Sequence, residues 1–198
     1  MKTKKKALLL VMCALLLVGA TVMGTLAYLT DTTNTVTNTF TVGDVTITLD
    51  ESVVGGEGRT STTQDVEQEY GVVVPGATFA KDPIVHVDDD SQSCWVFVKV
   101  ENDLVTVESD EEGESIAAQM AANGWKPLAD VDNVYYQENT QSAGADIDVF
   151  ETVNIDKDAS NAAIEALGEE PTIVVTAYAI QTSSEYTTAA AAWTAGGF

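Results

Sequence analysis

Basic residues are scarce in this chain of 198 residues, which has nine Lys and Arg residues against 31 Asp and Glu residues. Four of the nine lie within the first six positions and the first acid is Asp31, so the chain after Ala27 carries a formal charge of −26. Such a surface repels phosphate backbones and anionic lipid headgroups. We therefore exclude nucleic acid as a partner and expect membrane contact only through an uncleaved N-terminal leader.

Histidine and cysteine are nearly absent: His86 is the one histidine, and Cys13 and Cys94 are the two cysteines. The sequence has no His-Glu-x-x-His motif of a zinc protease and no Gly-x-Ser-x-Gly nucleophile elbow. We interpret His86 as a structural strand residue and Cys94 as a small buried hydrophobe, with an intermolecular disulfide as the alternative for Cys94. We therefore predict no catalytic residue and no resident cofactor, a weak Ca²⁺ site excepted.

The first 27 residues are typical of a secretory signal peptide. A basic segment, Lys2–Lys6, precedes the apolar run Ala7–Ala20, and small residues precede a cleavage site between Ala27 and Tyr28. The uncharged stretch is also long enough to span a bilayer if it stays attached, and lipidation of Cys13 is a weaker alternative. We predict cleavage and a secreted chain that starts at Tyr28.

β-Branched residues dominate the chain after the leader, and they favour strands. Val45, Ile47 and Leu49 alternate with threonines, the pattern of a half-buried strand. Because no β-α-β alternation is present, we predict an all-β fold, an antiparallel jelly-roll-like β-sandwich with two short helices, over residues 44–198. The expected strands are 36–42, 44–50, 71–74, 84–87, 94–101, 131–137, 147–155 and 172–181, the last in a central position.

Two alanine-rich segments favour short helices, Glu114–Trp125 and Asp158–Leu167, each followed or ended by glycine. On the strand 94–101, Trp95 and Phe97 lie on the face opposite Cys94. We expect the first helix or a second sheet to cover these two rings, since an uncovered pair would form an interaction patch.

Three consecutive acids, Asp88, Asp89 and Asp90, follow the strand 84–87. Carboxylate oxygens are the ligands that Ca²⁺ prefers, so these residues are the candidate metal ligands of the chain. Their spacing does not match an EF-hand loop, and a solvated acidic turn is the alternative interpretation.

The N-terminal fifty residues, which include GTLAYLTD (24–31) and NTFTVG (38–43), resemble the family of secreted proteins processed by the signal peptidase SipW. That family includes the biofilm fibre protein TasA and the camelysin (CalY) surface proteins of Gram-positive bacteria. It more often has Phe at the position of Leu29. Looser similarities follow along the chain at 74–76, 81–83, 96–100, 177–181 and 192–193.

The resemblance implies a secreted jelly-roll subunit of extracellular-matrix or cell-surface fibres, with a SipW-type peptidase and other copies or related matrix subunits as partners. It also implies that residues 28–43 act as a donor strand for a neighbouring subunit. The residues themselves agree, because this segment is β-prone and Asp31 is its one charge. The strand-exchange candidates are Tyr28, Leu29, Val36 and Phe40.

The sequence is compatible with two other functions. Camelysin relatives are labelled metallo-endopeptidases, although this chain lacks a zinc-ligand pattern. A monomeric surface module that binds cations or a partner is the third hypothesis. Pairing of residues 33–42 within their own subunit is the alternative to strand donation.

Overall fold

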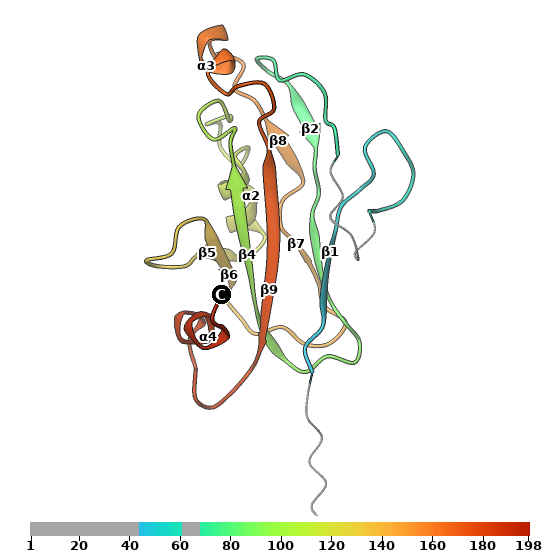
Figure 1. The fold of residues 1–198 in the computed structure, drawn as a ribbon, viewed down its shortest axis with the longest axis vertical. Helices are drawn as coiled ribbons and strands as arrows, with labels where there is room; N and C mark the ends of the chain where they lie inside the picture. Colours follow the sequence, from blue (N-terminus) through green and yellow to red (C-terminus); the bar gives the residue numbers. More distant parts are fainter. Residues whose placement is uncertain (1–43, 61–67) are drawn as a thin grey trace, which may run out of the picture. The chain divides into compact units, whose positions relative to one another are not determined.

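The computed structural model describes residues 44–60 and 68–198, all within one unit that spans Val42–Phe198 (Figure 1). Several predictions fall outside the described residues: the signal peptide 1–27, the donor segment 28–43 and the strand 36–42. The same holds for the cleavage-site and strand-exchange residues Ala27, Tyr28, Leu29, Val36 and Phe40.

The described residues form antiparallel sheets with a few short helices, which confirms the all-β prediction. One sheet has the order β1 (Ile47–Asp50), β3 (Ile84–Val87), β7 (Asp146–Asp148). A second pairs β2 (Thr78–Ala80) with β8 (Thr152–Asn154). The third has the order β5 (Trp125–Pro127), β6 (Val134–Gln137), β4 (Cys94–Asn102), β9 (Ile173–Gln181).

The predicted strand 147–155 is two strands, β7 and β8, which pair with different partners. The interruption lies opposite Pro83, which has no N–H to donate to a ladder. The Pro83 carbonyl still accepts from the N–H of Val149 at 2.9 Å, and Phe150 turns into the core between the two strands. The predicted strand 71–74 is wrong, since these residues join no ladder and Val72 is 81% exposed.

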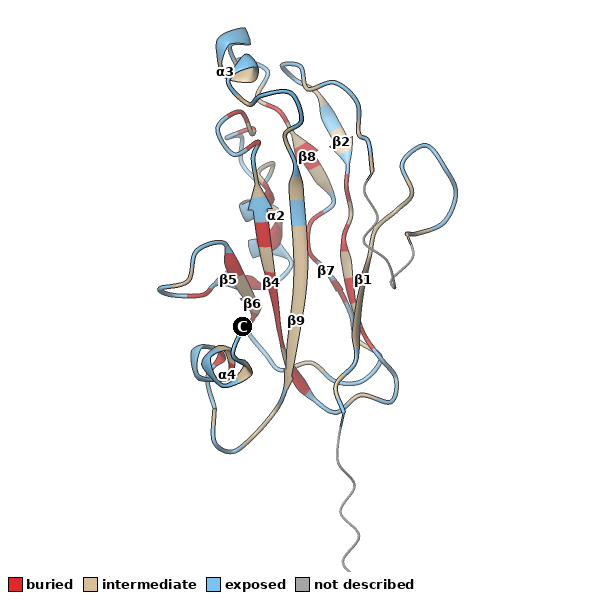
Figure 2. Cartoon of the chain, in the orientation of Figure 1, coloured by how far each residue is buried: buried red, intermediate tan, exposed pale blue. Residues whose placement is uncertain are grey.

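Strand β4 is buried over much of its length (Figure 2), and its sequence places apolar residues on both faces. Cys94, Val96 and Val98 are fully buried in the main hydrophobic cluster, which collects residues of all the sheets. Phe97 is fully buried in a second cluster on the opposite face. The four-stranded sheet is therefore covered on both sides at β4.

The two predicted helices are present but shorter: α2 (Ile116–Ala122) and α3 (Asn161–Glu165). Ser115 and Ser160 cap their N-termini, each accepting a backbone N–H of the first turn. A third helix, α4 (Ala189–Gly196), forms in the C-terminal tail. This helix, and not the predicted 114–125 helix, covers Phe97.

Strand β9 is an edge strand in the described residues, which corrects the prediction of a central position. Apart from the exposed Val174, its apolar residues are partly buried, against the main cluster on one face and the second cluster on the other. The nearly continuous apolar sequence of β9 reflects contacts on both faces of the sheet. Such contacts do not require a neighbouring strand on each side of β9.

No helix in residues 44–60 and 68–198 has the length and apolar character needed to cross a bilayer.

Candidate functional site

Strands β1 and β9 lie beside each other (Figure 1), and residues of both line a groove. β1 pairs with β3 and β9 pairs with β4, but in the described part of the chain no ladder joins β1 to β9. The groove has a volume of about 1440 Å³. Its apolar lining comes from Ile47, Leu49, Val73, Phe79, Leu104, Val153, Ile164, Leu167, Ile173, Val175 and Ala177.

One edge of β9 lines this groove, and no strand of the described residues 44–60 and 68–198 pairs with it. The N–H of Thr182 donates to Ser93 and that of Asp103 to Thr172, so the even-numbered residues of β9 bond to β4. The N–H and C=O groups of Ile173, Val175 and Ala177 therefore point away from β4. The side chains of these same residues pack against the main cluster.

The edge of β1 has the same arrangement. Because the N–H of Asp88 donates to Thr46, the ladder to β3 uses Thr48 and Asp50. Ile47 and Leu49 thus direct their backbone groups outward, and their side chains pack on the main cluster. A further strand placed between β1 and β9 could therefore form backbone hydrogen bonds with both of them and direct alternate side chains toward the main cluster.

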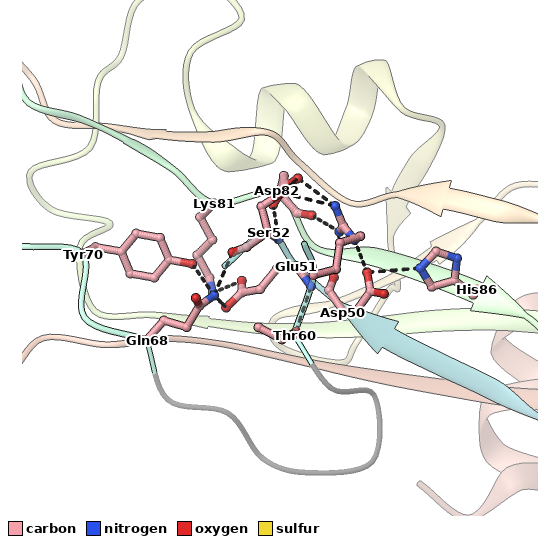
Figure 3. Close-up of polar contacts among 10 residues, drawn as sticks. Asp50, Glu51, Ser52, Thr60, Gln68, Tyr70, Lys81, Asp82 and His86 are labelled. Carbon is pink, nitrogen blue, oxygen red and sulfur yellow. Dashed lines mark hydrogen bonds and ion pairs between the residues drawn. The ribbon is translucent and has the colours of Figure 1, made fainter. Parts of the chain in front are cut away.

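A polar cluster that includes Asp50, Ser52 and Asp82 lies at the end of β1 (Figure 3), and Arg59 forms ion pairs with both of its carboxylates. The Arg59 guanidinium bonds Oδ1 of Asp50, Oδ2 of Asp82 at 2.9 Å, and the backbone oxygens of both residues. Ser52 donates to Asp82 from its N–H at 2.7 Å and its hydroxyl at 2.8 Å. We call Arg59, Asp50, Asp82 and Ser52 the arginine cluster.

The charges of the arginine cluster stabilise one another. Partial burial alone would lower the pKa of Arg59, but the bonds with Asp50 and Asp82 outweigh it and raise that pKa. Burial would likewise raise the pKa of Asp82, but the bonds from Ser52 and Arg59 outweigh it and lower the pKa. Arg59 and Asp82 therefore favour their charged forms, and the cluster ties β1 to the segment that precedes β3.

A second contact ties Glu51, the residue after β1, to Lys81. Lys81 is a buried residue, 9% exposed, and its ammonium lies 2.5 Å from Glu51 and 5.2 Å from the centroid of the Tyr70 ring. Gln68 donates to Glu51 at 2.8 Å. Burial and the Glu51 carboxylate raise the pKa of Tyr70. These side chains form one polar wall of the groove.

His86 joins three strands of its sheet. Its Nδ1 lies 2.6 Å from Asp146 on β7 and its Nε2 lies 3.1 Å from Asp50 on β1. Partial burial would lower the pKa of His86, but the bonds with Asp146 and Asp50 outweigh it and raise that pKa. The structural interpretation of His86 is supported, because its neighbours Val85 and Val87 are buried on the other face.

The acidic turn has a structural role that the sequence did not indicate. Ser91 bonds both the N–H and the C=O of Thr46 at 2.9 Å, and the N–H of Gln92 donates to Asp44 at 3.0 Å. Asp88 supports the turn by accepting the N–H of Asp90 at 3.0 Å. The turn thereby fixes the chain from Asp44 onward.

The calcium hypothesis at Asp88, Asp89 and Asp90 gains no support from this geometry. Among residues 44–60 and 68–198, no group of three or more His, Cys, Asp or Glu side chains is placed to hold a metal ion. Cys94 is fully buried and unpaired among the described residues, as its interpretation as a buried hydrophobe predicts. Burial raises the pKa of its thiol, which disfavours nucleophilic chemistry.

Comparison with known proteins yields no match to this chain, whether to family models, to curated proteins or to solved structures.

Proposed function

We propose that this chain is a secreted structural subunit of extracellular-matrix or cell-surface fibres, assembled by exchange of an N-terminal strand. The observation that carries the proposal is the groove between the open edges of β1 and β9. Each edge offers backbone groups to a further strand, and the inward side chains between them leave an apolar floor. Adding a strand to such an edge is a common mode of peptide recognition.

The proposed occupant is the segment 36–42 of a neighbouring copy. An inserted strand must alternate, with apolar side chains toward the main cluster and polar ones toward solvent. In VTNTFTV, Val36, Phe40 and Val42 share one face with Asn38, and threonines occupy the other. The segment carries no charge, which suits a groove bordered by Asp50, Glu51 and the exposed Glu165, Glu169 and Glu170.

Signal-peptide cleavage is the proposed trigger. A SipW-type peptidase that cuts between Ala27 and Tyr28 would free the donor segment from the membrane. In the proposed fibre each body is a jelly-roll-like sandwich whose missing strand comes from the next copy. Because the donor and the acceptor are different surfaces, the contact is head-to-tail and need not close, so it propagates as a filament. The sequence resemblance to the SipW-processed family agrees with this mode of assembly.

Electron microscopy of the purified chain from Tyr28 onward tests the proposal. We expect filaments from this chain and none after removal of Tyr28–Phe40, with circular dichroism showing that the shortened chain keeps its β structure. Filaments that persist in the shortened chain would refute strand donation. A folded but strictly monomeric parent chain at every concentration would favour pairing of residues 33–42 within their own subunit.

A further inference from the structure

The gap between β1 and β9 is narrower than the strand it is proposed to accept. Neighbouring strands lie about 4.8 Å apart, so two strands that flank a third are separated by about 9.6 Å. Cα atoms of β1 and β9 approach to within 8 Å of each other. One wall of the groove must therefore move outward before a strand can pair with both edges.

The two walls differ in how firmly they are held. β9 pairs with β4 over nine residues, from Ile173 to Gln181. β1 pairs with β3 over four residues, from Ile47 to Asp50. Breaking or bending the shorter ladder sacrifices fewer hydrogen bonds, so β1 is the wall that moves.

The arginine cluster opposes this movement. Arg59 holds Asp50, the last residue of β1, against Asp82, which precedes β3. Ser52, two residues further along, donates twice to the same Asp82 carboxylate. The ion pairs are partly shielded from water, since the Asp50 side chain is 12% exposed and that of Arg59 is 30% exposed. Charged hydrogen bonds of this kind contribute more than neutral surface ones.

We propose that the arginine cluster is a latch on β1, and that its release limits the rate at which a strand of a second copy enters the groove. This inference rests on the proposed function, because it concerns the acceptor groove of the same assembly. Arg59 acts here as a positioning residue that holds β1 and makes no contact with the incoming strand.

The test compares Arg59→Gln with Lys157→Gln in the chain from Tyr28 onward. Both changes remove one positive charge, but Lys157 pairs with Glu111 on an exposed surface outside the groove lining. For Arg59→Gln we expect hydrogen exchange of the Thr48 and Asp50 amides to rise by about tenfold or more, the scale of a lost charged hydrogen bond. We expect seeded filament elongation to accelerate by a similar factor, and Lys157→Gln to change neither quantity.

Two results would overturn the latch: unchanged exchange at Thr48 and Asp50, or faster exchange with elongation unchanged or slower. Arg59→Lys keeps the charge but lacks the forked geometry, so it should shift both quantities in the same direction by less. If Arg59→Gln does not fold, the same two measurements are made on Arg59→Lys. If the parent forms no filaments, the proposed function fails, and the exchange measurement alone still decides whether Arg59 holds β1.

Discussion

The two faces of the four-stranded sheet are closed in different ways. On the outer face α4 lies over β4 and β9, with the Trp193 ring 5.2 Å from that of Phe97 and 5.3 Å from that of Tyr178. Phe198 adds a further ring 5.1 Å from Tyr178. On the inner face the main cluster continues into the groove between β1 and β9, where Ile47, Leu49 and Val175 are only partly buried.

The outer and inner faces of the four-stranded sheet differ in the origin of the segment that covers them. The outer face is covered by the tail that directly follows β9, which buries Phe97 fully and leaves Tyr178 and Trp193 partly buried. The inner face ends at two strand edges that share no ladder in the described residues. Open edges are a hazard unless a partner fills them, and we infer that a strand of another copy is that partner.

The largest effect should follow a charge placed on the inward face of the donor segment. Phe40→Asp would put a carboxylate into the apolar groove, which costs several kcal/mol if it stays ionised, so we expect filaments to be lost. Thr39→Asp adds the same charge on the outward face and is the control, which should still assemble. Electron microscopy at matched concentrations gives the answer, and equal loss in both variants would contradict the assigned faces.

Truncation of the closed outer face comes next. Phe97 is fully buried, so Phe97→Ala should lower the free energy of unfolding by about 3–5 kcal/mol. Leu49→Ala, at the partly open groove, should cost clearly less in the unassembled chain. Urea unfolding of the two variants measures both costs. A Leu49→Ala cost as large as that of Phe97→Ala would mean that the inner face is already closed.

A smaller effect is expected at the helix caps. The Ser115 hydroxyl accepts the N–H of Ala118 at 3.2 Å and caps α2, which buries Ile116 and Met120 on the inner face. Ser115→Ala should therefore cost about 1 kcal/mol in thermal or urea unfolding. Ser160→Ala is the matched control. Because α3 has no buried residue, loss of its cap should lower the free energy of unfolding by less. A larger cost at Ser160 would contradict this ranking.

The smallest effect should be a pH dependence at His86. Its folded pKa is raised above the unfolded value of about 6.5. The stabilisation is therefore fully present below about pH 6.5 and is lost as the pH rises through the folded pKa. We expect the loss of unfolding free energy in His86→Gln, relative to the parent, to be larger at about pH 6 than at about pH 9. An equal loss at both pH values would show that protonated His86 does not stabilise its sheet.

The sequence predicted those strands and helices that carry a clear periodic pattern of apolar residues. Alternation identified β4 and β1, although the predicted strand 44–50 begins three residues before β1, and an alanine-rich segment before Gly124 identified α2. The division of β7 from β8 was missed because Pro83, which lies opposite the interruption, belongs to the segment between β2 and β3, more than sixty residues away in the sequence. The short strands β2 and β5 carry too few residues for a periodic signal.

The candidate site was harder to predict than the fold. The arginine cluster joins Arg59 to Asp50 and Asp82, and only the folded sheet brings these residues together. Arg59 lies in a polar, glycine-rich loop, and the sequence alone gives no sign that its side chain pairs with carboxylates of the sheet. Three consecutive acids, Asp88–Asp90, suggested a Ca²⁺ site. In the structure, the contacts of this turn are made largely by backbone groups and Ser91.

Cross-linking between copies tests the central claim most directly. In a Cys94→Ala background, the chain from Tyr28 onward would carry Phe40→Cys and Val175→Cys and be treated with a short thiol-reactive cross-linker. Strand exchange predicts a ladder of covalent dimers, trimers and longer chains that depends on protein concentration. A cross-linked monomer as the sole product at every concentration would show that the segment fills its own groove, and it would contradict the proposed assembly.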